Sequence, residues 1–340
     1  MNGDRSAWRI ALVAALAATA LYGSSFPYFR QYDLRNPEWN VDARDYVRMS
    51  HGDFDVFPVR RYRPLVPALA AVVRVPLVPV VADPVLRDRL AFYVVNFAFA
   101  LVAALALYAI LRTLDFSWAT SLIGMLLFVA SRVTVTSVGS PIVDAPFLAA
   151  IAVVLLLTLR GKPLLLGAAM PFLALTKDAI LPFLLLPLLD RRSRKWAVVA
   201  GIGAAFAVTL GTRWAIDHAF PLEKVASLGD VAAYLYRGNV LRSLQRLGTL
   251  AGVHDLLHGF GLLAPLALGA IAIGRVRRSR PLPPVLLATV PIAFAYALLS
   301  FNLGRMFFAA FVPVIAYSMV ALEFVFARAT EQQRAAQPGG

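Results

Sequence analysis

Long apolar runs dominate this chain, and short polar stretches separate them. The first run is Ile10–Tyr22, and nine more follow it: Leu90–Leu111, Trp118–Val133, Pro141–Leu159, Pro163–Thr176, Ala179–Leu189, Trp196–Arg213, Leu256–Ile273, Leu282–Phe301 and Arg305–Ala327. A helix needs about 20 mostly apolar residues to cross a bilayer, so the pattern predicts an all-α polytopic membrane protein with about ten transmembrane helices. We expect one transmembrane domain over residues 1–330 and a disordered tail over 331–340.

Some of these runs leave alternatives open. The two runs beside Lys177-Asp178 are shorter than a full crossing, which is typical of tilted helices shielded by neighbours or of a re-entrant hairpin. Small residues after Tyr22 would also suit a cleaved signal peptide. We favour an uncleaved first span, because the chain that follows is itself apolar enough to be membrane-embedded.

Residues 26–88 form the first loop outside the predicted spans, and this loop carries the densest group of charges. Asn40 is a candidate N-cap for a helix that places four residues on one face: Asp42, Asp45, Tyr46 and Met49. The helix dipole favours a carboxylate such as Asp42 in the first turn. The following stretch, 64–82, contains four prolines, which should leave only short helical pieces. We therefore expect it to lie on the bilayer surface as an interfacial segment.

Charge supports one orientation of the spans. The chain has a formal charge of +14, and dense basic runs lie at 190–195 and 275–280. Basic residues collect in cytoplasmic loops, so these runs and both termini are predicted inside, and loops 26–88 and 214–255 outside. We expect no nucleic-acid partner, since no basic soluble domain is present. The Arg-rich, Lys-poor composition is typical of a GC-rich bacterial genome, which indicates a bacterial cytoplasmic membrane with a periplasmic outer face.

With this orientation, ionisable residues at the span ends gather on the outer side. They are Asp144, Lys177, Asp178 and Arg305. Charges at membrane depth are costly, so they tend to pair or to face a water-filled cavity. Each residue also has a simpler interpretation. Asp144 could cap a helix, Lys177 and Asp178 could be exposed turn residues, and Arg305 could reach to the interface as a snorkelling side chain.

These features resemble the GT-C superfamily of polytopic glycosyltransferases, which use sugars linked to polyprenyl phosphate. The resemblance lies in Asp42 before Tyr46 in the first outer loop, Arg-Pro-Leu-x-Pro from Arg63, Asp144 at an outer span start, Leu-Thr-Lys-Asp at mid-chain and GRMFFAAFVP before the last span. Many members of the superfamily carry Lys-Glu where this chain has Lys177-Asp178. The resemblance implies an inverting transferase acting on the outer face, with a glycan or lipid hydroxyl as acceptor.

The resemblance and the chemistry together indicate residue roles. Transfer to a hydroxyl needs a carboxylate that takes the acceptor proton, and the resemblance makes Asp42 the first choice and Asp45 the second. The leaving phosphate needs cations, which arginine supplies through paired donors. We expect phosphate or substrate contacts from the following residues: Arg60, Arg61, Arg63, Asp144, Lys177, Asp178 and Arg305. The arginines of the first loop could instead bind lipid headgroups.

Three rival interpretations remain at this stage. Asp53-Phe54-Asp55 is an Asp-x-Asp pattern that could hold Mg²⁺ or Mn²⁺ as cofactor, although no strand–helix alternation surrounds it, and we read it as a solvated loop. His254 and His258 have zinc-protease spacing without a convincing third ligand. A transporter or flippase of lipid-linked sugars is the alternative to an enzyme, but transporters place charges near the bilayer midplane, whereas here they gather at one surface.

Overall fold

The computed structural model describes residues 2–36, 41–190, 194–221, 238–300 and 302–336. These residues fold into helices and contain no strand, which confirms the all-helical prediction. The helices of four residues or more are α1 (Asn2–Gln31), α2 (Val41–Ser50), α3 (Pro58–Arg61), α4 (Leu65–Leu77), α5 (Pro84–Thr113), α6 (Trp118–Val129), α7 (Arg132–Gly139), α8 (Asp144–Leu159), α9 (Pro163–Ala174), α10 (Leu181–Leu184), η2 (Leu186–Leu189), α11 (Lys195–Ala219), α13 (Leu241–Leu247), α14 (Leu250–His258), α15 (Leu263–Ala272), α16 (Gly274–Ser279), α17 (Pro284–Leu287), α18 (Thr289–Ser300), α19 (Leu303–Phe307) and α20 (Phe311–Ala336). Two three-residue turns of 3₁₀ helix are η1 (Asp178–Ile180) and η4 (Phe308–Ala310).

Four segments in the described part of the chain are long and apolar enough to cross a membrane. They are Trp8–Gln31, Pro84–Thr113, Lys195–Ala219 and Leu303–Arg328, and the number rises to six if each of two bent helix pairs counts as one span. The other predicted spans correspond to shorter apolar helices of 10 to 17 residues. The described helices are therefore consistent with a multi-pass membrane protein.

Both bent pairs break where the sequence supplies a local cause. The predicted span Trp118–Val133 divides into α6 and α7, bent by 54°, because the Ser131 side chain accepts a hydrogen bond from Thr134 N and starts a new helix. The predicted span Leu256–Ile273 divides into α14 and α15, bent by 103°. Gly261 lies in this second break with a φ of +53°, a conformation that glycine adopts without a Cβ clash.

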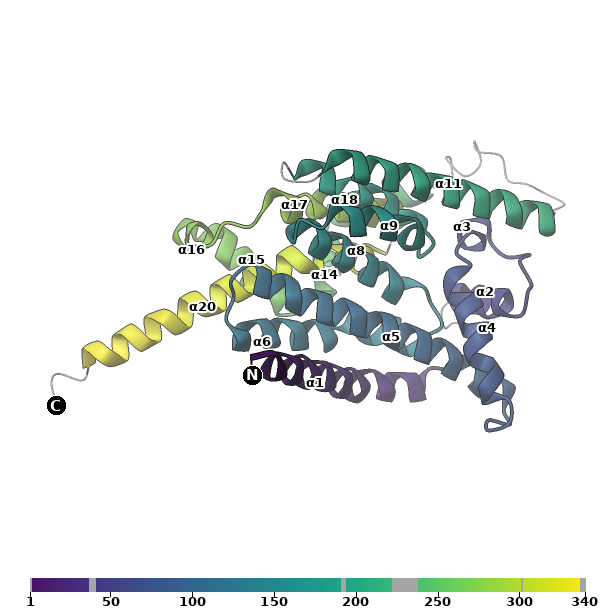
Figure 1. The fold of residues 1–340 in the computed structure, drawn as a ribbon, viewed down its shortest axis with the longest axis horizontal. Coiled ribbons are helices and arrows are strands. Elements are labelled where there is room, and N and C mark those ends of the chain that lie inside the picture. Colours follow the sequence, from purple (N-terminus) through teal and green to yellow (C-terminus); the bar gives the residue numbers. More distant parts are fainter. Residues whose placement is uncertain (1, 37–40, 191–193, 222–237, 301, 337–340) are drawn as a thin grey trace.

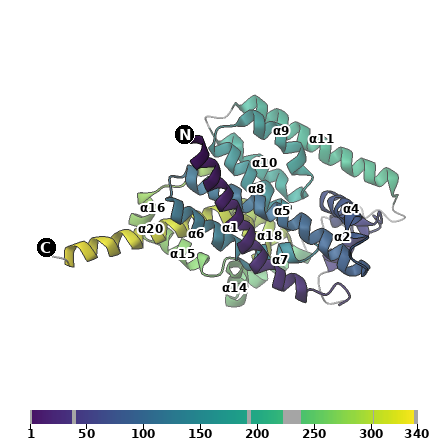
Figure 2. The same ribbon diagram turned by 60° about the horizontal axis from the view of Figure 1, so that its bottom comes forward.

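The longest helices run alongside one another, and the first outer loop lies at one end of them (Figure 1). Helices α2, α3 and α4 gather at this end, whereas the N-terminus, α16 and the far end of α20 lie toward the opposite end (Figures 1 and 2). Helix α5 packs against α8, α9 against α11, and α15 against α20. This arrangement positions the turns between helices at the α2–α4 end, where the site lies.

The first outer loop is more helical and shorter than predicted. Helix α2 has the predicted position and carries Asp42 in its first turn, whereas the candidate cap Asn40 lies outside the described residues. Helix α4 is continuous over 13 residues despite its prolines. Pro64 precedes it and Pro67 lies in its first turn, where the missing N–H has no helical acceptor. Helix α1 extends the first span to Gln31, and α5 starts at Pro84.

Two other boundaries also differ from the sequence-based expectation. Helix α20 continues to Ala336, so residues 331–336 are helical where a disordered tail was expected, and 337–340 lie outside the described residues. In the second outer loop, α11 continues to Ala219 and α13 begins at Leu241, while 222–237 lie outside the described residues.

Candidate functional site

Helix α2 packs against the rest of the protein through apolar residues, and its carboxylates lie on the same face. Tyr46 and Met49 are 1% and 3% exposed and pack into a cluster with Val66 and Val143. Asp45 is also buried, and Asp42 lies one turn earlier. The predicted face of Asp42, Asp45, Tyr46 and Met49 is thus the face that contacts the rest of the protein.

Arg60 on α3 holds both carboxylates of α2. Its Nε atom lies 2.7 Å from Asp42 Oδ1, and its Nη1 lies 2.5 Å from Asp45 Oδ2. A guanidinium that spans two carboxylates fixes their spacing through charge-assisted hydrogen bonds. The ring of Phe57 lies 5.2 Å from the guanidinium carbon and limits the freedom of Arg60 further.

Arg63 lies behind the same helix and interacts with a phenol. Its Nη1 donates to Tyr46 Oη at 3.0 Å. Burial raises the pKa of Tyr46. Burial by itself lowers the pKa of Arg63, but the nearby Tyr46, Tyr296 and Asp178 raise it above its ordinary value overall. Arg63 is therefore a permanent positive charge at the buried face of α2, beside Tyr46.

Asp144, the first residue of α8, lies at the centre of the charged network. Lys177 Nζ donates to its Oδ1 at 2.9 Å, and Arg305 Nε donates to its Oδ2. Arg305 also lies with its Nη1 3.6 Å from Asp42 Oδ2. Arg305 consequently joins the first outer loop to Asp144, and the predicted convergence of these residues on one site is found in the structure.

Lys177 is enclosed by protein. The whole residue is 3% exposed, and its ammonium lies 5.2 Å from the Phe147 ring centroid and 5.1 Å from that of Tyr296. Met306 Sδ lies 3.8 Å from Nζ. This enclosure excludes the water-exposed turn that the sequence left open for Lys177, and Lys177 lines neither the polar cavity nor the apolar groove described below.

Two predicted residues lie outside this network. Asp178 accepts a hydrogen bond from Arg213 Nη2 of α11 at 2.7 Å. Arg61, a predicted phosphate contact, is fully buried and paired with Asp217 at 3.2 Å, while its other nitrogens donate to backbone carbonyls. Each nitrogen of the Arg61 guanidinium thus has a partner in the protein, and its predicted phosphate contact stays a prediction.

A polar cavity of about 520 Å³ adjoins the network. Its lining includes Arg305 and extends over α7, α13, α14 and α19: Arg132, Val133, Thr136, Arg246, Asp255, His258, Gly259, Asn302, Leu303, Gly304 and Arg305. Asp255 neutralises Arg246, and Arg132 contacts His258. No carboxylate of the described residues lies within ion-pair distance of Arg132. The cavity therefore presents a positive charge to whatever enters it.

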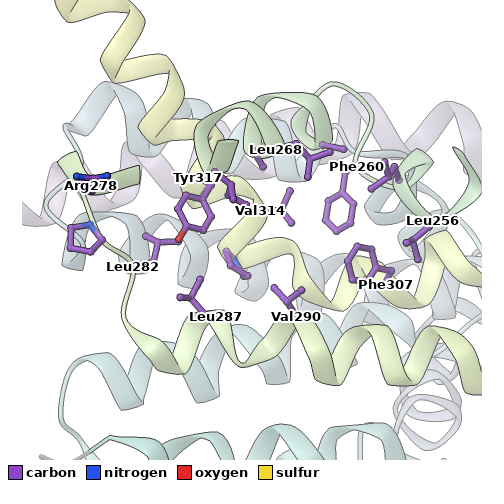
Figure 3. A pocket seen from close by; sticks show the side chains of 16 residues that line it. Leu256, Phe260, Leu268, Arg278, Leu282, Leu287, Val290, Phe307, Val314 and Tyr317 are labelled. Atoms are coloured by element: carbon purple, nitrogen blue, oxygen red, sulfur yellow. The ribbon is translucent and has the colours of Figure 1, made fainter. Parts of the chain in front are cut away.

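An apolar groove of about 650 Å³ continues from the same helices. Leu256, Leu257 and Phe260 line it, next to Asp255, His258 and Gly259 of the polar cavity. Figure 3 shows Phe260, Val290, Phe307 and Tyr317 around one space, with Leu256 and Arg278 at opposite ends. Helices α14 and α19 thus contribute polar residues to one space and apolar residues to the next. A ligand with a charged head and a hydrocarbon tail would fit this pair of spaces.

The two candidate metal patterns have other partners. Asp53 pairs with Arg48 at 2.7 Å and accepts a hydrogen bond from Asp55 N. The rings of His254 and His258 contact each other in a tilted arrangement, with their centroids 5.1 Å apart. Among the residues that the structure describes, no group of three or more His, Asp or Glu side chains could hold a metal ion.

Sequence reasoning missed Arg132, Arg246 and Tyr296. Arg132 was hidden inside the predicted span Trp118–Val133, although an arginine at an outer span end was the signal that identified Arg305. Arg246 and Tyr296 carry no comparable signal, because only the packing of α13 and α18 brings them to the site.

No protein-family model, curated protein or solved structure matches the chain. The functional argument therefore depends on the geometry of the site.

Proposed function

We propose that this protein is a membrane glycosyltransferase of the GT-C type. It moves a sugar from a polyprenyl-phosphate donor to an acceptor hydroxyl. The observation that carries the proposal is the position of Arg305, which lines the polar cavity and pairs with both Asp42 and Asp144. A carboxylate is thereby held next to a positively charged space that opens beside an apolar groove, and a lipid-phosphate donor requires this combination.

The proposal includes a ten-span arrangement in a bacterial cytoplasmic membrane. The shorter apolar helices would complete the crossings by pairing with longer neighbours, as α9 does with α11. Gly167 and Gly201 allow this pair to approach closely, since a Cβ on Gly167 would lie 2.5 Å from Ala197 O. Both termini would be cytoplasmic, and α2–α4 and the polar cavity would face the periplasm.

The donor would bind across both spaces. Its phosphate fits the polar cavity, where Arg132, Arg246 and Arg305 supply donors for an anion. Its isoprenoid tail fits the apolar groove between α14, α15, α18 and α20. As the bond between the anomeric carbon and the phosphate oxygen breaks, negative charge grows on the leaving phosphate, and the cationic lining stabilises it.

Asp42 would act as the general base. It takes the proton of the acceptor hydroxyl while the oxygen bonds to the anomeric carbon, and the polyprenyl phosphate leaves from the opposite face with inversion. Arg60 and Arg305 orient the Asp42 carboxylate through ion pairs. Asp45 shares Arg60 but is more buried than Asp42, which makes it the second choice.

Lys177 and Arg63 support this site without touching substrate. Lys177 neutralises Asp144, which in turn orients Arg305 toward the cavity. Arg63 anchors α2 through Tyr46. We thus assign phosphate contact to Arg305 and to the cavity arginines, and positioning to Lys177, Arg63 and Asp144.

One observation favours a flippase as the alternative function. The groove extends from Leu256, beside the polar cavity, to Arg278 at its other end, so a lipid headgroup could find a cation at both ends. A flippase would need no general base, and this difference separates the two functions.

The test is transfer of radiolabelled sugar from polyprenyl-phosphate donors by the purified protein in proteoliposomes. Asp42→Asn should lower transfer by about 10²- to 10⁴-fold, because a general base contributes that much. The matched control is Asp53→Asn, which removes a carboxylate of the same loop whose ion pair is with the exposed Arg48. Lipid flipping that survives Asp42→Asn, with no transfer by the unmodified protein, would favour the flippase instead.

A further inference from the structure

We infer that the end of α11 acts as a clamp that holds the first outer loop on the Lys177 turn. The clamp consists of Arg61, Tyr62, Arg213 and Asp217. The inference rests on the proposed function, because it names residues that set the geometry around Asp42. Each of the four is a positioning residue, since none of them lines the polar cavity.

Arg61 caps the C-terminal end of α11. Its Nη2 donates to the carbonyls of Ile216 and Phe220, the former at 3.3 Å, and its Nε lies 3.2 Å from Asp217 Oδ1. The last carbonyls of a helix lack partners within the helix, and the helix dipole favours a cation there. Its Nη1 donates to Phe54 O of the first outer loop at 2.7 Å. One buried guanidinium therefore joins the loop to the helix end.

Tyr62 and Phe54 strengthen the same contact. The Tyr62 hydroxyl donates to both carboxylate oxygens of Asp217, at 2.9 and 3.1 Å. The rings of Phe54 and Phe220 stack with centroids 4.7 Å apart. Because α3 has only four residues, it has little stability of its own, and these contacts determine where it lies.

The same side of α11 also contacts the turn that carries Lys177. Arg213 places its guanidinium carbon 5.0 Å from the Tyr62 ring centroid and donates from Nη2 to Asp178 Oδ2 at 2.7 Å. One turn of α11 separates Arg213 from Asp217, so a single rigid helix contacts both the loop and the Lys177 turn.

This arrangement sets the distance between two halves of the site. Arg60 and Arg63, which hold the carboxylates and tyrosine of α2, flank Arg61-Tyr62 in the sequence. Lys177, which holds Asp144, precedes Asp178. Because residues 61–62 and 178 are held by one helix, the position of Asp42 relative to Arg305 is also fixed. Arg305 Nη1 lies 3.6 Å from Asp42 Oδ2.

The first test measures the clamp without enzyme activity. The chain contains no cysteine, so spin labels can be attached at Asp55→Cys and Ala215→Cys with no background. The distance distribution between the labels should be narrow in the otherwise unmodified protein and broader after Asp217→Asn or Arg61→Gln. Arg74→Gln is the matched control, since this arginine of the same outer segment binds Asp88 and not α11. An unchanged distribution in Asp217→Asn would overturn the clamp. This variant keeps the test usable if Arg61→Gln does not fold, because asparagine has the size of aspartate and the Asp217 side chain is half-exposed.

The second test measures the effect on transfer. Asp217→Asn should lower kcat about tenfold or more with a smaller change in KM, because misplaced groups lose transition-state contacts. Asp217→Glu should recover part of the loss. A broader label distribution with an unchanged kcat would overturn the positioning role. If the unmodified protein transfers no sugar while the distribution still broadens, the proposed function fails and the clamp stands.

Discussion

Arg305 separates two regions that differ in how their cations are used. On one side, Lys177 and Asp144 are 3% and 4% exposed and neutralise each other within the protein. On the other side, Arg132 lines a cavity of about 520 Å³, and no carboxylate of the described residues lies within ion-pair distance of it. Buried pairs resist rearrangement, because separating them leaves an uncompensated charge in an apolar surrounding. Cations at a cavity can exchange water for a ligand at small cost. We therefore propose that the first region organises the site and that the second binds the ligand.

The largest expected effect concerns the enclosed side. Lys177→Met should lower the free energy of unfolding by about 3–5 kcal/mol, since Asp144 loses one of its two partners in a buried site. Equilibrium unfolding in mixed micelles measures the change. The double variant with Asp144→Asn should recover part of the loss, because no isolated carboxylate remains. A loss below about 1 kcal/mol, the value for an exposed pair, would show that Lys177 is not enclosed as described.

The next effect concerns the cavity side. Arg132→Gln should weaken binding of polyprenyl phosphate about tenfold to a hundredfold, because a hydrogen bond to a charged group contributes about 1.5–3 kcal/mol. Stability should change by no more than about 0.5 kcal/mol. Fluorescence titration with a labelled lipid phosphate measures binding, and Arg48→Gln, at an exposed pair elsewhere, is the control. Unchanged affinity would remove the cavity from the binding site.

A smaller effect is expected in the apolar groove. Leu268 is 53% exposed and lines the groove, so Leu268→Ala should weaken binding of a long-tailed donor about threefold to tenfold. A donor with a tail too short to reach α15 should bind equally to both forms. Leu262→Ala is the matched control, since Leu262 is exposed but lies outside the groove lining. Equal losses for both tail lengths would place the tail elsewhere.

The smallest effect concerns the exposed pair Arg48–Asp53, which serves as a reference for both regions. The hydrogen bond from Arg48 lowers the pKa of Asp53 below its ordinary value. A lowered pKa in the folded state means that the pair stabilises the fold above the unfolded pKa, and this is lost as pH falls through the folded pKa. Asp53→Asn should cost about 0.2–1 kcal/mol near neutral pH. The difference from the unmodified protein should vanish in acid, and a constant difference would contradict the pairing.

Local patterns predicted the part of the site that lies on regular elements. The spacing of Asp42, Asp45 and Tyr46 predicted α2 and the face of it that packs on the protein. The hydropathy pattern predicted that Asp144, Lys177 and Arg305 lie at the same end of the bundle. Patterns could not separate Arg60 from Arg61. Adjacent residues on a helix point about 100° apart, and only the packing of α11 against α3 decides which one contacts the α2 carboxylates.

The polar cavity was also beyond the reach of the sequence. Arg246 and Asp255 belong to two helices, α13 and α14, and the packing of α13 on α14 and of α14 on α19 is a tertiary feature. The lengths of the helices could not be predicted from the sequence for a similar reason. Hydropathy shows that a segment is apolar, but the Ser131 cap and the turn at Gly261 decide where a helix breaks.

The most direct measurement of the central claim is cysteine accessibility at Asn302, which lines the polar cavity and is exposed. Asn302→Cys should react with a membrane-impermeant maleimide from the periplasmic side, and polyprenyl phosphate, but not polyprenol, should protect it. Thr113→Cys is the control, because Thr113 lies at the end of α5 away from α2–α4, and it should react only after permeabilisation. Reaction of Asn302→Cys only from the cytoplasmic side, or equal reaction with and without the lipid phosphate, would contradict an anion-binding cavity beside Asp42 on the outer face.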